Sequence, residues 1–178
     1  MKWIGITGSW RVTDENVESD VRAAVRDSID SGNGIVTGGA LNVDSFALDE
    51  ALRLDPAATR IRVCLPVTLE RYAAHYRKRA EESVITREQA ETLIAELTKF
   101  QRTNPEALLE NRTNTTVDKT TYYERNTQVV DLSDELIAFQ VNESRGVQDT
   151  INKALRAGKP VSVRRYTLLV SPRTNQAG

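Results

Sequence analysis

Glycines and polar side chains follow two short apolar runs near the amino terminus. Ile4-Gly5-Ile6-Thr7 leads into Gly8-Ser9-Trp10-Arg11, and Ile35-Val36-Thr37 leads into Gly38-Gly39-Ala40. An apolar strand that ends in small residues just before a helix leaves backbone N–H groups free to bind an anion. Serine adds a hydroxyl donor and arginine adds a guanidinium fork. The two junctions therefore predict phosphate-binding loops that share one crevice.

Two later segments are expected at the same edge of the sheet. They are the helix start with Arg125-Asn126 and the loop Ser144-Arg145-Gly146. In an open parallel sheet, ligands bind beyond the carboxyl ends of the strands, where these segments would meet. The predicted ligand-binding residues are Gly8, Ser9, Trp10, Arg11, Gly38, Gly39, Ala40, Asp44, Arg125, Asn126, Ser144, Arg145 and Gly146.

For several side chains near the predicted site, the sequence leaves two roles open, one in ligand binding and one in structure. Asp44 either caps the second helix or orients a ribose hydroxyl, and capping is favoured. Trp10 either stacks on a base or packs against the neighbouring loop, with packing as the default. Tyr72, His75 and Tyr76 either line the crevice or form a helix-packing stripe.

The apolar spacing predicts alternating strands and helices. Residues 3–8, 35–37, 60–67, 135–141 and 160–163 are expected as strands, and helices are expected after Asp14, over 43–54, over 122–132 and from Val147. Short strands that alternate with helices imply right-handed crossovers and helices on both faces of a parallel sheet. We therefore predict an α/β fold with about five parallel strands.

The middle of the chain breaks this alternation. Residues 68–121 contain no convincing strand and are expected to form a helical insertion, with a helix around Tyr72, another from Thr86 and a short one over 104–109. The Thr- and Asn-rich segment 111–121 is expected to be a mobile loop and a candidate lid. One domain over 1–170 and a flexible polar tail over 171–178 complete the predicted organisation.

Composition narrows the class of protein. The chain has 178 residues, of which 39% are hydrophobic, and its formal net charge is −1. A balanced charge disfavours a general nucleic-acid binder, although it leaves room for a local basic patch. Cys64 and His75 are the only residues of their types, so an internal disulfide and a Cys/His zinc site are excluded. With no apolar run near the roughly 20 residues of a membrane span and no signal peptide, we expect a cytoplasmic protein.

Three signatures of common classes are missing. The first strand is not followed by Gly-x-Gly-x-x-Gly, and the chain contains neither Gly-x-x-x-x-Gly-Lys-Ser/Thr nor Gly-x-Ser-x-Gly. The missing motifs therefore exclude ordinary dinucleotide-binding enzymes, P-loop proteins and serine hydrolases with a nucleophile elbow.

Five ordered motifs resemble the SLOG superfamily, which includes the DNA-processing protein A family and the Lonely Guy phosphoribohydrolases. They are Gly5-Ile6-Thr7-Gly8-Ser9, the segment 35–47, Val63-Cys64-Leu65-Pro66, Glu124-Arg125-Asn126, and 144–151 with Gly158-Lys159-Pro160-Val161. The resemblance implies a small stand-alone member with a Rossmann-like fold and a pocket for nucleotides or nucleotide-derived ligands. It places Gly8, Ser9, Gly38, Gly39, Arg125, Asn126, Ser144 and Gly146 at the positions that line the family's pocket.

The sequence departs from this pattern at two places. Asn42 stands where the DNA-processing family usually has glycine, and asparagine visits left-handed backbone more readily than most residues. Thr150 falls where the phosphoribohydrolases carry a catalytic glutamate; the nearby carboxylates are Glu124, Glu143 and Asp149.

Three functions remain in order of preference. The first is binding of a nucleotide-type small molecule as a sensor or carrier, with no cofactor other than that nucleotide and with a homo-oligomeric assembly. The second is hydrolysis of the N-glycosidic bond of a nucleoside monophosphate, with Glu124, Glu143 or Asp149 as the acid/base. The third is single-stranded DNA binding, as in the DNA-processing family.

Overall fold

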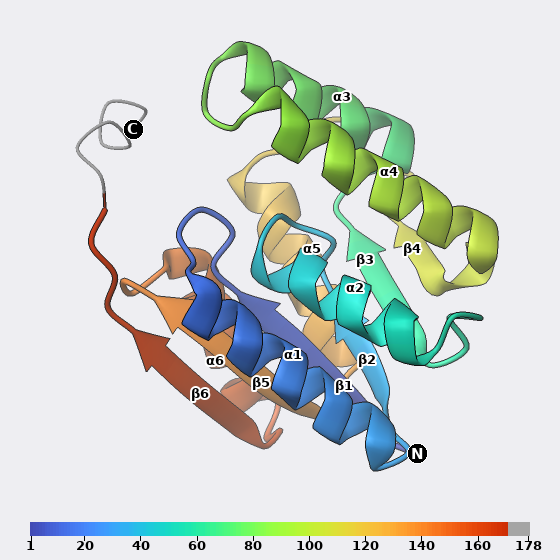
Figure 1. Cartoon of the computed structure of the whole chain (residues 1–178), viewed down its shortest axis with the longest axis vertical. Coiled ribbons are helices and arrows are strands. Elements are labelled where there is room, and N and C mark those ends of the chain that lie inside the picture. Colours follow the sequence, from blue (N-terminus) through green and yellow to red (C-terminus); the bar gives the residue numbers. More distant parts are fainter. Residues whose placement is uncertain (171–178) are drawn as a thin grey trace.

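A six-stranded parallel sheet forms the centre of the computed structural model, which describes residues 1–170 (Figure 1). The strand order is β4-β3-β2-β1-β5-β6. The bounds are β1 Trp3–Gly8, β2 Gly34–Thr37, β3 Ile61–Leu65, β4 Leu108–Glu110, β5 Glu135–Val141 and β6 Val161–Tyr166. The tail predicted over 171–178 lies outside the described residues. Because β1 lies between β2 and β5, the strand order reverses its direction at β1, which is where open α/β sheets bind ligands.

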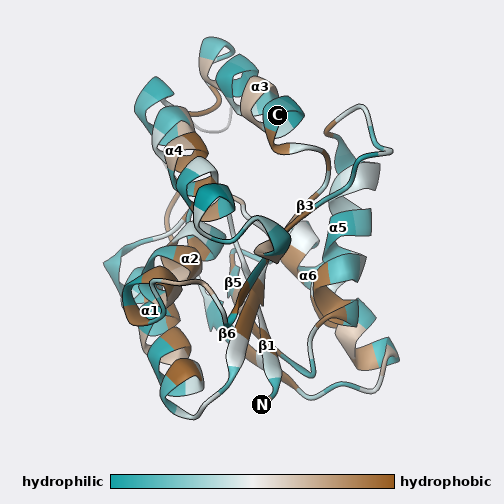
Figure 2. Ribbon diagram, turned by 90° about the vertical axis from the view of Figure 1, so that its right-hand side faces the viewer, coloured by the Kyte–Doolittle hydropathy of each residue, from teal (hydrophilic) through white to brown (hydrophobic). Residues whose placement is uncertain are grey.

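Helices lie on both faces of this sheet and beyond the carboxyl ends of its strands. They are α1 Glu15–Asp30, α2 Val43–Leu54, α3 Leu69–Glu81, α4 Arg87–Thr103, α5 Lys119–Asp131 and α6 Arg145–Arg156. In Figure 2, α1 and α2 lie on one side of the sheet and α5 and α6 on the other. The predicted Rossmann-like three-layer α/β arrangement is confirmed. Within residues 1–170, none of these helices is both long and apolar enough to cross a membrane.

Most of these helices and strands lie where the sequence predicted them, because capping residues and apolar spacing determine their positions locally. Asp14 caps α1 by accepting a hydrogen bond from the Val17 amide, and the apolar stripe of α1 is buried against the sheet. Helix α2 and strand β5 have the predicted bounds. Gly158 ends α6 with a φ of +69°, a backbone conformation that costs glycine little.

The sheet has one strand more than the roughly five predicted, because β4 lies inside the presumed helical insertion. Pro105 begins a short 3₁₀ turn, η1 (Pro105–Ala107), as its position suggested. The chain then extends instead of continuing as a helix, and Leu108 pairs with Val63 on β3. Burial of Leu108 under the α4 side of the core favours this edge strand over the helix expected for 104–109.

The start of α5 was also predicted three residues too late. Asp118 accepts a hydrogen bond from the Thr121 amide, and the Thr121 hydroxyl accepts one from the Asp118 amide. This reciprocal capping box begins the helix at Lys119 in a stretch that has almost no apolar residues. The pattern of hydrophobic residues alone does not indicate that α5 begins at Lys119.

The hairpin of α3 and α4 forms a cap beyond the carboxyl ends of the strands (Figure 1). Thr86 begins α4 with a second capping box, as its sequence position indicated. The Ser45 hydroxyl on α2 donates a 2.7 Å hydrogen bond to Glu96 on α4, so a polar contact joins the cap to a helix that covers the sheet.

This contact predicts a dependence of stability on pH. Burial raises the pKa of Glu96 to about 7 from its ordinary 4.5, Ser45 and Arg22 oppose the shift, and Asp49 adds to it. A carboxyl with a raised pKa stabilises the fold fully below its ordinary pKa, and this contribution is lost as the pH rises through about 7. We expect Glu96→Gln to gain free energy of unfolding over the wild type as the pH rises from about 5.5 to about 8.5, measured by urea denaturation. Exposed Glu88→Gln on the same helix is the control; equal pH profiles for wild type and Glu96→Gln would contradict the prediction.

Candidate functional site

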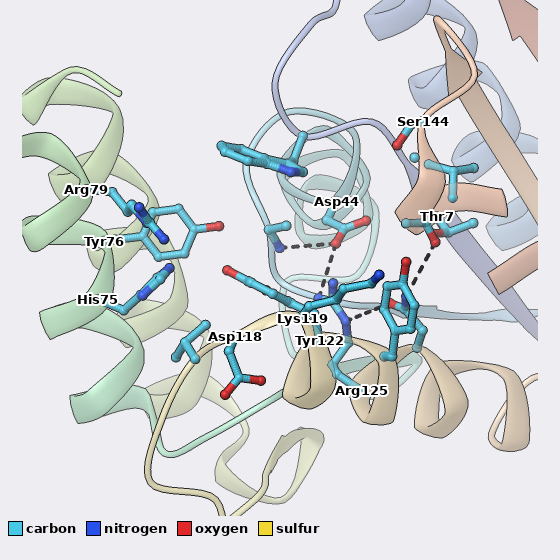
Figure 3. Close-up of a pocket in the computed structure, with 18 residues that line it drawn as sticks. Thr7, Asp44, His75, Tyr76, Arg79, Asp118, Lys119, Tyr122, Arg125 and Ser144 are labelled. Atoms are coloured by element: carbon cyan, nitrogen blue, oxygen red, sulfur yellow. Dashed lines mark hydrogen bonds and ion pairs between the residues drawn. The ribbon is translucent and has the colours of Figure 1, made fainter. Parts of the chain in front are cut away.

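A cavity of about 340 Å³ opens at the carboxyl end of β1, beneath α3 (Figure 3). Five separate segments line it: the end of β1 with the loop that follows, the turn and first residues of α2, the inner face of α3, the start of α5, and the start of α6. It therefore lies at the reversal of strand order, where the sequence predicted the site.

A buried ion pair forms the floor of this cavity. The Arg125 guanidinium on α5 lies 3.7 Å from the Asp44 carboxylate on α2, and both side chains are at most 10% exposed. Arg125 also donates to the Gly38 carbonyl and, from Nε, to Asn126 Oδ1 at 3.2 Å. Asp44 accepts a 3.1 Å hydrogen bond from the Ala40 amide. Asp44 thus closes the turn before α2 although it is the second helical residue and not the N-cap.

Burial raises the pKa of Asp44, and the nearby Arg125 opposes that shift. The pair is close to neutral as a unit, so Arg125 is not a free cation for a ligand. The Gly38–Ala40 loop is similarly engaged, because the Gly38 carbonyl and the Ala40 amide bond to this pair. An anion is better placed elsewhere in the cavity.

The aromatic walls come from three elements. Trp10 follows β1 and is 38% exposed, Tyr76 lies on α3, and Tyr122 and Tyr123 lie on α5. In Figure 3, Tyr76 extends from the α3 side and Tyr122 from the α5 side into the same space. Burial raises the pKa of both Tyr76 and Tyr122, so their hydroxyls remain protonated at neutral pH. The Tyr76 hydroxyl already shares a 3.3 Å hydrogen bond with the Tyr72 hydroxyl, so these residues offer their ring surfaces to a ligand.

Two positive charges besides Arg125 line the cavity, and one of them, Arg79, is ion-paired: its Nη1 donates to Glu82 Oε2 at 2.9 Å. Arg79 lies on α3, and Lys119 at the start of α5 places its ammonium 5.4 Å from the centre of the Tyr123 ring. His75 also lines the cavity, and burial lowers its pKa, so it is neutral at pH 7. Lys119, and Arg79 through the guanidinium nitrogens other than Nη1, are therefore able to pair with a phosphate.

Gly8, Ser144 and Gly146 line the wall opposite α3. Ser144 is the N-cap of α6, but its hydroxyl makes no capping hydrogen bond. The Asn126 side chain joins α5 to the start of α6, because it donates to the Gly146 carbonyl at 3.4 Å and to Asp149 Oδ2 at 3.2 Å. The start of α6 therefore belongs to a cavity wall built of small residues, and a helix N-terminus suits an anion.

Several predicted site residues lie away from this cavity. The buried Ser9 hydroxyl accepts from the Val141 amide at 3.0 Å and donates to the Val141 carbonyl, so it ties β1 to β5. Gly39 has a φ of +67° and faces Leu65, while Arg145 is exposed on α6. Arg11 lines a neighbouring cavity and stacks on Trp10, with 5.3 Å between its guanidinium and the ring centre.

The three carboxylates considered as acid/base groups also lie outside the cavity lining. Glu124 accepts from the Asn114 amide group at 2.7 Å, and Asp149 pairs with Lys153 at 2.6 Å. Glu143 is exposed in a turn with a φ of +55°. Among the residues that line the cavity, the carboxylates are Asp44 and Asp118.

Asn42 occupies the left-handed side of backbone space that the family pattern fills with glycine. Its φ is +62° and its ψ is −110°, which is strained for a residue with a side chain. The Asn42 side-chain amide donates to the Trp10 carbonyl. The asparagine therefore joins the loop after β1 to the start of α2, a link that glycine lacks.

Sequence reasoning missed the α5 wall beyond Arg125-Asn126. Lys119, Tyr122, Tyr123 and Asn126 share one helical face by their spacing, but that face appears only if the helix begins at Lys119. The Asp118 capping box was the signal that could have shown it. Asp118 and Val117 also line the cavity from the predicted lid.

The predicted lid, residues 111–121, is hydrogen-bonded to the loop after β3 and to helices α3 and α5. Asn114 donates to the Pro66 carbonyl at 3.1 Å as well as to Glu124, and Arg71 on α3 donates to the Asn114 carbonyl at 2.9 Å. These hydrogen bonds fix the segment in place, and its last part, with Val117 and Asp118, forms part of the cavity wall.

Comparison with solved structures supports the same fold. DNA processing protein A from Helicobacter pylori, whose structure was described for its single-stranded DNA binding mode, matches with a TM-score of 0.67 and 22% identity over 98% of this chain and 70% of that chain. The molybdenum cofactor carrier protein from Chlamydomonas reinhardtii matches with a TM-score of 0.52 and 18% identity over 99% of this chain and 82% of that chain.

No curated protein matches the sequence at a significant level. The sequence model of the DNA recombination-mediator protein A family, in contrast, matches residues 1–176, nearly the whole chain. The predicted SLOG resemblance is confirmed, and the chain belongs to the DNA recombination-mediator protein A family.

Proposed function

We propose that this protein binds a nucleotide or nucleotide-derived small molecule in the cavity at the carboxyl end of β1. The observation that carries the proposal is the cavity itself, which brings aromatic faces, the cations Lys119 and Arg79, and the start of α6 together within about 340 Å³. Ligand pockets typically combine apolar and aromatic walls with a few convergent polar groups.

The phosphate of the ligand lies at the wall of Gly8, Ser144 and Gly146, within reach of Lys119. This placement differs from a phosphate on the Gly38–Ala40 loop, because Arg125 and Asp44 already use that loop. The base and ribose extend toward α3, between Trp10 and Tyr76. Arg79 then pairs with a second phosphate or with a polar edge of the base.

The proposal is tested with two arginines on the same helix. Each arginine pairs with a glutamate at 2.9 Å, Arg79 with Glu82 and Arg77 with Glu91, but Arg79 lines the cavity and Arg77 does not. We expect AMP or ADP to raise the melting temperature of the wild type, and Arg79→Gln to weaken binding by about tenfold or more, since a hydrogen bond to a charged group contributes about 1.5–3 kcal/mol. The matched variant Arg77→Gln should bind like the wild type in calorimetry.

Native mass spectrometry of the freshly purified protein checks for a retained nucleotide. No retained ligand, together with no stabilisation by any nucleotide, would overturn the proposal.

Single-stranded DNA is the second candidate, favoured by the family match and by the relative from Helicobacter pylori. A labelled oligonucleotide in the same titration series separates the two candidates. DNA binding that falls steeply with salt and is not displaced by mononucleotides would favour this second function.

A further inference from the structure

A second cavity, of about 270 Å³, adjoins the first. Its walls come from the loop after β1, from the end of β5 with the turn that follows, and from the segment after β6. Val12, Val141 and Val170 supply apolar surface, and Arg11 supplies a guanidinium.

Two residues, Trp10 and Ser144, line both cavities. Trp10 is among the few large apolar side chains that remain exposed in the described chain, and Arg11 stacks on its ring. The two spaces therefore meet at an aromatic ring on one side and at the uncapped start of α6 on the other.

The segment after β6 is fixed as a wall of the second cavity. The Asn142 side chain donates to the Leu168 carbonyl at 2.8 Å and accepts from the Leu168 amide at 2.9 Å. The Asn142 amide also donates to the Tyr166 carbonyl at 3.0 Å. These three hydrogen bonds hold Val170 beside the cavity, two residues beyond the last bonded group.

We propose that the second cavity is a subsite for the second nucleoside of a dinucleotide, with Trp10 as the partition between the two halves. The inference rests on the proposed function, because the first nucleoside occupies the first cavity. The linking phosphate lies at Ser144, the polar residue common to both spaces. The second base or ribose lies among the three valines, and Arg11 pairs with a phosphate or stacks on the base.

Physical considerations favour a two-part ligand over two independent ones. The first cavity is at the lower end of the sizes that hold small-molecule ligands, so a larger nucleotide must extend beyond it. A ligand half tethered by a phosphate enters its subsite at a high effective concentration, which adds affinity without new contacts in the first cavity.

Calorimetry on the full chain tests this with four probes: AMP, an equimolar mixture of AMP and adenosine, 5′-phosphorylated ApA, and ADP-ribose. We expect the dinucleotide to bind about tenfold or more tightly than AMP, and the mixture to bind like AMP alone. The 3′–5′ linked probe stands for the end of a single strand, and ADP-ribose, whose second half is a ribose joined through a 5′–5′ pyrophosphate, stands for a free two-part metabolite, so their ranking identifies the source.

Substitutions at two adjacent residues test whether the gain in affinity of the dinucleotide over AMP arises in the second cavity. Val170 lines the second cavity and is 40% exposed, whereas adjacent Leu169 is fully exposed to solvent. Val170→Trp should fill the second cavity and abolish the gain of the dinucleotide over AMP, while AMP binds as before; Leu169→Trp should leave both affinities unchanged.

The outcomes separate the two proposals. If AMP does not bind at all, the proposed function fails. If AMP binds but neither two-part probe binds more tightly, or if Val170→Trp leaves the dinucleotide gain intact, only the second subsite is overturned.

Discussion

Arg125→Met should lower the free energy of unfolding by about 3–5 kcal/mol, because it leaves the buried Asp44 carboxylate without its positive partner. The Gly38 carbonyl loses its guanidinium donor in the same variant. This would be a large part of the total stability of a small domain. The measurement is urea denaturation followed by circular dichroism.

The pH dependence has a definite sign. Burial raises the pKa of Asp44 even in the wild type, and removal of Arg125 raises it further. A group with a raised pKa stabilises the protein below its ordinary pKa and loses that contribution as the pH rises, so the defect in Arg125→Met should be smaller in acid than at neutral pH.

A double-mutant cycle separates the ion pair from simple packing loss. Asp44→Asn combined with Arg125→Met should cost less than the sum of the two single changes, because the uncompensated charge is gone. Exposed Arg102→Met on α4 is the control for loss of an arginine. Strict additivity would show that Asp44 and Arg125 do not act as a pair.

Gly8→Ala should destabilise the fold by about 1–3 kcal/mol and weaken ligand binding, since the added methyl group has no space. A Cβ at this position would lie 2.5 Å from both methyl carbons of Val43, the first residue of α2. The end of β1 and the start of α2 must then move apart, and both border the cavity. Thermal unfolding and nucleotide titration measure the two effects.

Two companion variants test this explanation. In a Val43→Gly background, the same Gly8→Ala change should cost much less, because the clashing side chain is absent. Gly146→Ala has no neighbour within 4 Å and should be neutral or stabilising by about 0.5–1 kcal/mol, as is usual for glycine replaced inside a helix. A full Gly8→Ala defect in the Val43→Gly background would contradict the packing argument.

The sequence predicted the fold best where local signals were strong. The apolar run of β5 and the capping residues Asp14 and Thr86 lie where they were expected, because burial and capping act within a few residues. Strand β4 was missed because only its pairing with β3 makes Leu108–Glu110 extended. Such pairing between distant segments leaves no local periodicity in three residues.

A cavity lies at the edge of the sheet where the sequence predicted the site, but only some of the predicted residues line it. Gly8, Ser144 and Gly146 line the cavity as expected, whereas the Ser9 hydroxyl bonds to β5. Arg125 was expected to hold an anion, and its charge is instead largely balanced by Asp44. Side-chain partners across the fold decide such roles, and residue type alone cannot identify them.

The place of β1 between β2 and β5 has a consequence for synthesis on the ribosome. Residues 1–110 supply four of the six strands and could pair while the rest of the chain is still being made. Asp44 would then await Arg125, and the cavity would lack its α5 and α6 walls until the last third of the protein has emerged. The proposed nucleotide site thus needs residues from both halves of the described chain, and a nascent fragment with most of the sheet would lack that site.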